Sequence, residues 1–202
     1  MIVIDYYLAL NSPWAFLGAE RFITMTKQAG ATVRVKPARY GQVFEKTGGL
    51  PLPKRSPERR AYRMMELKRW SATLGQPLVH EPKSFPNDDA PGTRLIIAAA
   101  MQGLDALRLS LETGRAMWEL NQDNSDAAVL DAACTRAGID AAALRAKSAP
   151  DAELDKIWDA NTVDALKQGV FGAPAYVFQD GEFFWGQDRL MFVERKLAAL
   201  KA

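Results

Sequence analysis

Residues 1–16 read MIVIDYYLALNSPWAF and join an apolar segment to the start of a helix. Residues 2–8 are almost continuously apolar, which is typical of a strand that is buried on both faces of a sheet. Ser12 and Pro13 follow, a capping side chain and a proline that the first helical turn tolerates. Apolar side chains then recur near helical spacing as far as Gly30, where we expect the helix to end.

Strand patterns occur again shortly after this helix and at the far end of the chain. Residues 32–38 alternate apolar and basic side chains and predict a second strand, which gives a β-α-β unit with parallel strands. Residues 175–178 and 182–185 flank an Asp-Gly turn and predict a β-hairpin. Residues 187–201 then predict a closing helix.

Between the two ends, residues 41–164 lack the alternation of strands. The pattern predicts a helix over residues 57–74, a proline-rich loop over 76–92 and alanine-rich helices as far as residue 167. We expect breaks in these helices at Gly103, Gly114, Gly138 and Pro150.

This order of elements is typical of an α/β, thioredoxin-like fold in which an all-helical insertion separates the βαβ half from the ββα half. We assign residues 1–40 and 165–202 to the thioredoxin-like domain. Residues 41–164 form the helical insertion subdomain in this interpretation.

The composition is that of an ordinary globular chain. It has 202 residues, of which 48% are hydrophobic and 25% are charged. The net charge of +2 gives no general attraction to nucleic acid or to an anionic membrane. One cysteine, Cys134, and one histidine, His80, exclude an intrachain disulfide and leave too few ligands for an ordinary zinc site. We therefore expect a cytoplasmic protein with no metal, no nucleic-acid partner and no membrane segment.

The segment Ser12-Pro13-Trp14-Ala15 occupies the place where thioredoxin-like proteins carry a reactive Cys-x-x-Cys pair. Ser12 and Ala15 stand where the two sulfurs would be, so dithiol chemistry is excluded at this site. The N-terminus of a helix favours an anion, and a hydroxyl there can donate a hydrogen bond to a thiolate supplied by a ligand. The alternative is that Ser12 is only a helix cap.

A second motif, Gly172-Ala173-Pro174, directly precedes the predicted strand at residues 175–178. Thioredoxin-like folds place a cis-proline at this point, which turns the backbone groups of the preceding residue outward. The Ala173 backbone could then pair with a peptide-like ligand as a short added strand. The alternative is an ordinary trans proline that begins an edge strand.

Two further polar segments are candidate ligand contacts. Gln187 and Asp188 lie at the start of the closing helix, where they could receive the amino and carboxyl groups of an amino-acid-like ligand. Asp188 can equally serve as the cap of that helix. The basic stretch at residues 54–63 is either a solvated helix face or the source of one or two side chains that hold a ligand carboxylate.

Taken together, these segments resemble the family of 2-hydroxychromene-2-carboxylate isomerases and kappa-class glutathione transferases. The resemblance extends from Ile2 to about Leu197 and depends on the order and spacing of several short motifs. They are Asp5-Tyr6-Tyr7 before Ser12-Pro13, Tyr62 with Leu67-Lys68-Arg69-Trp70 and Pro77-Leu78, Val170-Phe171-Gly172-Ala173-Pro174, and Phe184-Trp185-Gly186-Gln187-Asp188-Arg189.

The resemblance implies that glutathione is the cofactor and that the protein is a homodimer. It implies that the glutathione thiolate lies near Ser12 and that the cysteinyl unit pairs with the Ala173 backbone beside cis-Pro174. It also implies that Gln187 and Asp188 receive the γ-glutamyl end.

The remaining expectations concern the glycyl carboxylate of glutathione and the substrate. Arg59 matches a family lysine and keeps its charge, so the resemblance implies that it holds the glycyl carboxylate. Leu50 stands where the family often has Asn, which suggests a different substrate. For an aromatic, carboxylate-bearing substrate we expect stacking surfaces from Trp14, Phe171 and Trp185, and a counter-charge from Lys54, Arg55 or Arg59.

We therefore predict a glutathione-dependent cis–trans isomerase of the 2-hydroxychromene-2-carboxylate isomerase type. A thiolate would add to a conjugated enone, permit rotation about the new single bond and leave again. One alternative is a kappa-class glutathione transferase or peroxidase. Another is a thioredoxin-like module without active-site cysteines that binds a peptide along Ala173 and Pro174.

Overall fold

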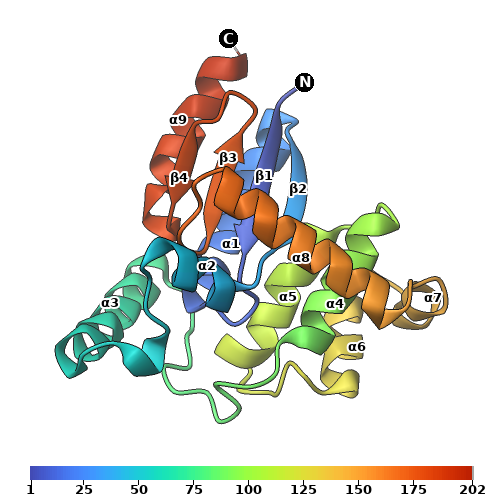
Figure 1. Ribbon diagram of the computed structural model, residues 1–202, viewed down its shortest axis with the longest axis horizontal. Coiled ribbons are helices and arrows are strands. Elements are labelled where there is room, and N and C mark those ends of the chain that lie inside the picture. The colour runs from blue at the N-terminus through green and yellow to red at the C-terminus, as the bar shows by residue number, and fades with distance from the viewer. Residues whose placement is uncertain (202) are drawn as a thin grey trace.

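The computed structural model describes residues 1–201 and has a four-stranded sheet of order β2-β1-β3-β4 at its centre (Figure 1). The strands are β1 (Val3–Leu8), β2 (Thr32–Pro37), β3 (Ala175–Phe178) and β4 (Phe183–Trp185). β1 is parallel to β2 and antiparallel to β3, and β4 is antiparallel to β3. The βαβ unit and the hairpin predicted from the sequence therefore share one sheet and meet at β1 and β3.

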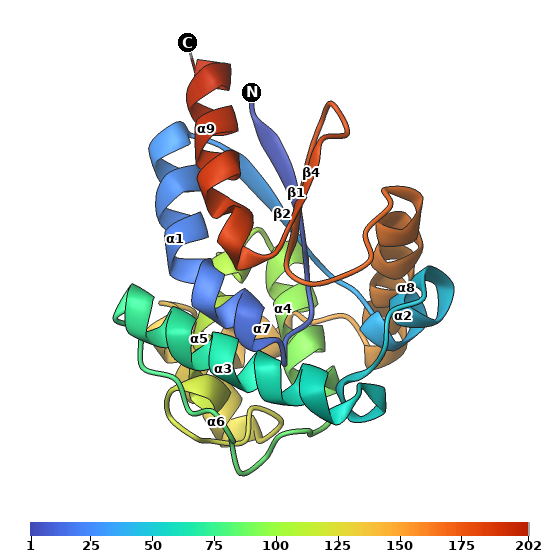
Figure 2. The same cartoon turned by 90° about the vertical axis from the view of Figure 1, so that its left-hand side faces the viewer.

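Helices cover both faces of this sheet. α1 (Pro13–Ala29) and α9 (Leu190–Lys201) lie on one face, and α2 (Tyr40–Thr47) and α8 (Asp151–Lys167) lie on the other (Figure 2). Successive residues of a strand point to opposite faces, so β1 contributes to two cores. Tyr6 contacts Phe22 of α1 in the first core, and Tyr7 lies in the second core with Val43 of α2.

The chain between β2 and β3 is helical, as the sequence predicts. Beyond α2 and α8 it contains η1 (Leu52–Lys54, a 3-10 turn), α3 (Pro57–Leu74), α4 (Ala90–Met101), α5 (Ala106–Trp118), α6 (Ala127–Arg136) and α7 (Ala141–Ala146). The expected α/β thioredoxin-like fold with a helical insertion is therefore confirmed. None of the helices within residues 1–201 is long and apolar enough to cross a membrane.

The insertion shares its core with the thioredoxin-like part. Leu10, from the loop after β1, is buried in a cluster with Ile96 of α4 and Leu109 of α5. A second cluster joins Phe16 of α1 to Leu67 of α3. These shared clusters fix the position of α3 and α4 relative to the start of α1.

One predicted helix break is wrong. Gly114 lies inside α5 and does not interrupt it. A Cβ at this position would lie 3.5 Å from the Cβ of Phe16, which is an ordinary van der Waals distance, so the contact with α1 does not itself require a glycine. Most residues of α5 are buried, and this tertiary packing keeps the helix continuous through Gly114.

One helix was not predicted from the sequence. α2 has eight residues, and the side chain of its N-cap residue, Arg39, forms no capping hydrogen bond. Tyr40 and Val43 are buried against the sheet in the same core as Ala165 of α8. Tertiary contacts therefore stabilise a helix whose local pattern is weak.

Candidate functional site

Ser12 caps α1 at the end of the sheet where β1 finishes. Its Oγ accepts a hydrogen bond from the Ala15 N–H at 3.3 Å, and its carbonyl accepts one from the Phe16 N–H at 3.1 Å. The hydroxyl proton of Ser12 has no acceptor among the described residues. Ser12 can therefore cap the helix and still donate a hydrogen bond to a ligand.

The loop before β3 leaves the sheet beside the end of β1, because Tyr7 pairs with Ala175. The Ala173–Pro174 peptide bond is cis, in agreement with the functional interpretation of this motif. The Ala173 N–H and C=O form no hydrogen bond within residues 1–201. Both groups are therefore available to an extended ligand.

Two contacts hold this loop in place. The Tyr40 hydroxyl of α2 donates a hydrogen bond to the Gly172 carbonyl at 3.3 Å. On the other side the Trp185 ring lies so close to Gly172 that a Cβ there would be 2.8 Å from Trp185 Cε2. A glycine is therefore required at residue 172 for Trp185 to approach the loop.

A 3-10 turn, η2 (Gln187–Arg189), follows β4 and leads into α9. It begins after Gly186, whose φ of +95° favours glycine. The Gly186 N–H donates to the Pro174 carbonyl at 2.9 Å, so η2 is attached to the cis-proline loop. Gly186 holds the N-cap position of η2, and Asp188 lies inside this turn, two residues before α9 (Leu190–Lys201) begins.

The side chain of Gln187 does not point freely into solvent. The residue is 1% exposed, and its Oε1 accepts a hydrogen bond from Arg21 of α1. Asp188 is partly exposed and forms an ion pair with Arg189 at 2.6 Å. The two neighbouring residues therefore present different groups, a buried amide and an accessible carboxylate.

α3 and Arg55, the residue that follows η1, form a basic wall of the cavity that η2 also lines. Arg55, Arg59 and Arg63 line the same cavity and form no ion pair within residues 1–201. Burial and the nearby Arg55 charge lower the pKa of Arg63 to about 10. Burial and the Arg59 charge also lower the pKa of Arg55. The three guanidinium groups therefore repel one another and would be stabilised by an anion.

The carboxylates at this cavity do not neutralise the basic wall. Glu66 is paired with Arg69 at the surface of α3, and Asp188 is paired with Arg189. The cavity therefore carries a local excess of positive charge, although the whole chain is near neutrality.

Seven of the residues predicted from the sequence line this cavity, which has a volume of about 380 Å³. They are Trp14, Arg55, Arg59, Ala173, Trp185, Gln187 and Asp188. They come from α1, the end of η1, α3, the cis-proline loop, β4 and η2. Segments that are far apart in the sequence thus meet at one site.

Four predicted residues lie outside the lining of the cavity. Ser12 is two positions before Trp14, and Pro174 directly follows Ala173; Trp14 and Ala173 line the cavity. Phe171 packs edge-on against Trp185, with ring centroids 4.8 Å apart, and is 41% exposed. Lys54 is exposed in η1.

The departure at Leu50 also lies outside the lining. Its side chain is 45% exposed, and its carbonyl accepts a hydrogen bond from Arg55 Nε at 2.8 Å. The contact with Arg55 uses the main chain of residue 50, so the exposed Leu50 side chain takes no part in it.

Three lining residues of α3, Tyr62, Glu66 and Trp70, were not predicted from the sequence as ligand contacts, and Arg63 was included only as part of the basic stretch at residues 54–63. Trp70 lies half-buried at the cavity wall. Together with Arg59 these residues recur every three or four positions, which places them on one face of a helix. That stripe was the available signal.

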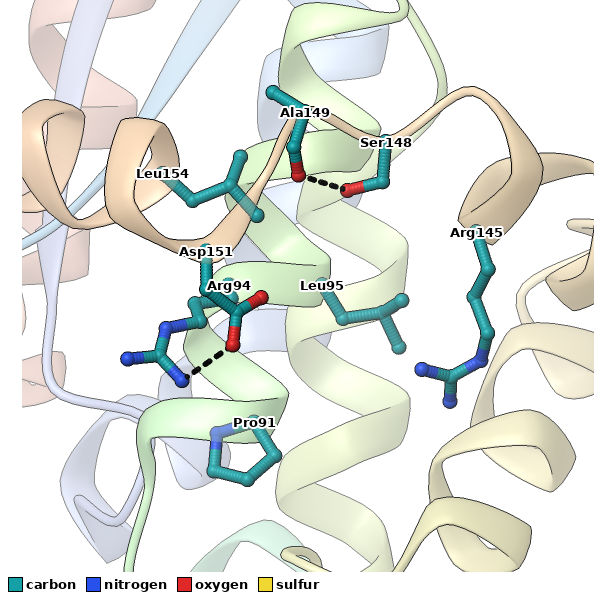
Figure 3. A pocket seen from close by; sticks show the side chains of 8 residues that line it. All are labelled: Pro91, Arg94, Leu95, Arg145, Ser148, Ala149, Asp151 and Leu154. Atoms are coloured by element: carbon teal, nitrogen blue, oxygen red, sulfur yellow. Dashed lines mark hydrogen bonds and ion pairs between the residues drawn. The ribbon is translucent and has the colours of Figure 1, made fainter.

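A second cavity, of about 390 Å³, lies between α4, α7 and α8 (Figure 3). Arg94 and Arg145 lie on opposite sides of it in that view. Arg94 is paired with Asp151 and Arg145 with Asp131, so both charges are already neutralised. No predicted site residue lines this cavity. Within residues 1–201 no group of three His, Cys, Asp or Glu side chains is placed to hold a metal ion.

Comparison with known proteins identifies relatives that match the full length of the chain. A 2-hydroxychromene-2-carboxylate isomerase from Sphingobium xenophagum is 27% identical over 196 residues, which cover 96% of this chain and 97% of the relative. One from Pseudomonas putida is 23% identical, with 98% and 96% covered. The full-length relationship to these isomerases is distant.

Solved structures show the same fold. A 2-hydroxychromene-2-carboxylate isomerase superposes with a TM-score of 0.78 at 23% identity, over 98% of this chain and 95% of that one. The cytosolic disulfide reductase DsbM from Pseudomonas aeruginosa, in a structure with GSH, gives a TM-score of 0.69 at 17% identity, over 98% and 96%. The model of the DSBA-like thioredoxin domain matches residues 3–198. The chain therefore belongs to the DSBA-like thioredoxin domain family.

Proposed function

We propose that this protein is a glutathione-dependent cis–trans isomerase of the 2-hydroxychromene-2-carboxylate isomerase type. The observation that carries the proposal is the Ser12 hydroxyl, which has a free proton at the N-terminus of a 17-residue helix. Dithiol redox chemistry has no sulfur at this position. A hydroxyl there suits a thiolate that a cofactor brings.

The residues of the cavity fit glutathione, which is an extended peptide with two carboxylates. The free N–H and C=O of Ala173 beside Pro174 would pair with its cysteinyl unit. Arg59 would hold the glycyl carboxylate, and Gln187 and Asp188 would receive the γ-glutamyl end. The support is the lining of one cavity by Ala173, Arg59 and η2.

Bound glutathione would supply a thiolate that adds reversibly to a conjugated enone and so permits rotation about a former double bond. Ser12 would donate a hydrogen bond to the sulfur, and the positive end of the α1 dipole would act in the same direction. Both lower the pKa of the thiol, because both favour its charged form.

An aromatic, carboxylate-bearing substrate would lie against the exposed rings at this end of the molecule. Trp14 and Trp185 line the cavity, and Phe171 extends the Trp185 surface outward. The counter-charge would come from Lys54 or from the unpaired guanidinium groups of α3. We further propose that the protein acts as a homodimer in the cytoplasm, where glutathione is kept reduced.

The first test is a calorimetric titration with reduced glutathione at several pH values, while the ultraviolet thiolate band is followed. Binding with a lowered thiol pKa supports the proposal. The absence of binding at millimolar glutathione would overturn it and would favour a peptide-binding module.

A second measurement identifies the reaction. A 2-hydroxychromene-2-carboxylate is offered with a substoichiometric amount of glutathione, and both the product and the remaining glutathione are measured. An isomerase turns over many times without consuming glutathione. Consumption in proportion to product would instead identify a kappa-type transferase or peroxidase.

A further inference from the structure

η2 carries Gln187 and Asp188, but the contacts that hold this turn come from α1. Arg21 Nη2 donates hydrogen bonds to the Gln187 Oε1 and to the Gln187 carbonyl, the latter at 3.3 Å. Arg21 thus holds both the side chain and the main chain of one residue of the turn.

The packing around this contact is unusually close. A Cβ at Gly18 would lie 2.8 Å from Gln187 Cβ and 3.1 Å from the Tyr176 hydroxyl oxygen. Gly18 and Arg21 are three residues apart and so share a face of α1. On this face Gly18 has no side chain and lets η2 approach, and the long side chain of Arg21 binds η2.

The cluster is not arranged for stability alone. Three of its buried polar atoms, Arg21 Nε, Gln187 Nε2 and the Tyr176 hydroxyl, have no hydrogen-bond partner within residues 1–201. Burial lowers the pKa of Arg21 and raises that of Tyr176. Unpartnered buried polar groups destabilise a fold, so their concentration behind η2 calls for a functional reason.

Arg21 does not itself line the site cavity. It lines a separate surface cavity of about 340 Å³ between α1 and α9, together with Glu20 and Glu194. Its hydrogen bonds reach the site through Gln187, which belongs to this cluster and also lines the site cavity. Arg21 is therefore placed to position a binding element and not to contact a ligand.

We propose that Arg21 is a positioning residue that fixes η2 relative to Ser12 and thereby sets the affinity for the γ-glutamyl end of glutathione. Ser12 and Arg21 belong to one helix, about 14 Å apart along its axis at 1.5 Å per residue. α1 thus carries the contact for the thiolate at its N-terminus and the support of the γ-glutamyl site further along. This inference rests on the proposed function.

The test compares two thiol ligands by calorimetry. Reduced glutathione carries the γ-glutamyl amino and carboxyl groups, whereas N-acetylcysteinylglycine keeps the thiol, the amide and the glycyl carboxylate but lacks them. In Arg21→Met we expect the affinity for glutathione to fall about tenfold, while that for N-acetylcysteinylglycine changes less than about twofold. Lys27→Met is the matched control, because Lys27 lies on the same helix and its side chain forms no hydrogen bond or ion pair within residues 1–201.

If Arg21→Met folds poorly, two further variants test the same role. Arg21→Lys retains a donor and should recover most of the preference for glutathione, and Gly18→Ala should reduce it by displacing η2. Equal losses for the two ligands, or an unchanged ratio in every variant, would overturn the positioning role. The proposed function fails separately, if the unmodified protein binds neither ligand.

Discussion

At the scale of single residues, Ser12 combines two tasks that experiments can separate. Its oxygen accepts from the Ala15 N–H and caps α1, while its proton is free for a ligand. The cap contributes to stability whether or not a ligand is bound, whereas the donated hydrogen bond acts only on a bound thiolate. The two tasks therefore respond to different measurements.

We expect Ser12→Ala to raise the pKa of the bound glutathione thiol by about 1–2 units, the equivalent of a lost hydrogen bond to a charged group. Activity should fall at pH 7 and recover in part at higher pH, where the thiol ionises without help. The pH profile of kcat/KM and the thiolate band measure this effect. Asp140→Ala is the control. Asp140 also caps a helix, α7, by accepting a hydrogen bond from the Ala143 N–H at 3.0 Å, and it does not line the cavity. An unchanged thiol pKa in Ser12→Ala would contradict the role given to its hydroxyl.

Gly172 is the second residue whose role is local. We expect Gly172→Ala to push the Trp185 ring away, because the new Cβ would lie 2.8 Å from Trp185 Cε2. Overpacking of this kind costs about 1–3 kcal/mol of stability. The KM for an aromatic substrate should rise several-fold, and urea unfolding should show the loss of stability. Gly41→Ala is the control, since a Cβ there meets nothing within 4 Å. A KM that stays constant in Gly172→Ala would remove Trp185 from the substrate site.

At the scale of elements, α8 is held on the sheet by a polar contact as well as by its apolar residues. Tyr7 of β1 donates a hydrogen bond to Asp164 at 2.6 Å, and Lys36 of β2 pairs with the same carboxylate. Burial alone would raise the pKa of Asp164, but the hydrogen bonds from Lys36 and Tyr7 outweigh it and lower that pKa. The ionised form of Asp164 is therefore favoured by the folded state.

We expect Asp164→Asn to lower the free energy of unfolding by about 1 kcal/mol at pH 7, a modest value because the carboxylate is partly exposed. Because the pKa of Asp164 is lower in the folded state, its carboxylate stabilises the fold at pH values above the unfolded-state pKa of about 4. This stabilisation is lost as the pH falls through the folded-state pKa. The difference from the unmodified protein should thus shrink below about pH 4 in urea titrations. Glu153→Gln, on the same helix and without an ion pair in the described chain, should change stability by only a few tenths of a kcal/mol. A difference that persists unchanged at low pH would rule out this explanation.

Local patterns predicted some elements and missed others for identifiable reasons. The strands, α1 and the cis-proline loop follow from apolar runs, a capping residue and a Gly-x-Pro motif that act within a few residues. α2 depends on contacts of Tyr40 and Val43 with distant segments, and α5 continues through Gly114 because tertiary packing buries most of the helix. Neither effect is visible in the local sequence.

The same division holds for the site. Ala173, Gln187 and Asp188 occur in recognisable motifs next to strand ends. Trp70 gives no local sign of a ligand contact, because it reaches the cavity only through the way in which α3 lies across it. The partnership of Gln187 with Arg21 joins residues 166 positions apart and could not be predicted from either segment.

At the scale of the whole molecule, the helical insertion is bound to the loop that precedes Ser12. Asn11 donates to Asn87 Oδ1 at 2.7 Å and accepts from Asn124 Nδ2 at 3.2 Å. Leu10, the residue before it, is 3% exposed and lies in the core of the insertion. The end of the sheet that precedes Ser12 and the insertion are therefore expected to fold and unfold together.

Leu10 gives the means to test this coupling. A Cβ at Gly92 of α4 would lie 2.6 Å from Leu10 Cδ2, so the side chain fills its space completely. We expect Leu10→Ala to cost about 2–5 kcal/mol, because it removes buried methyl groups and leaves a cavity. Far-ultraviolet circular dichroism, which reports mainly the helices, and tryptophan fluorescence should still give one coincident unfolding transition at a lower urea concentration. Leu104→Ala is the control, since Leu104 is 38% exposed on the same insertion and should cost much less. Two separate transitions in the unmodified protein would show that the insertion unfolds as an independent unit. A change at Leu10 could then not act on the loop before Ser12 through the shared core.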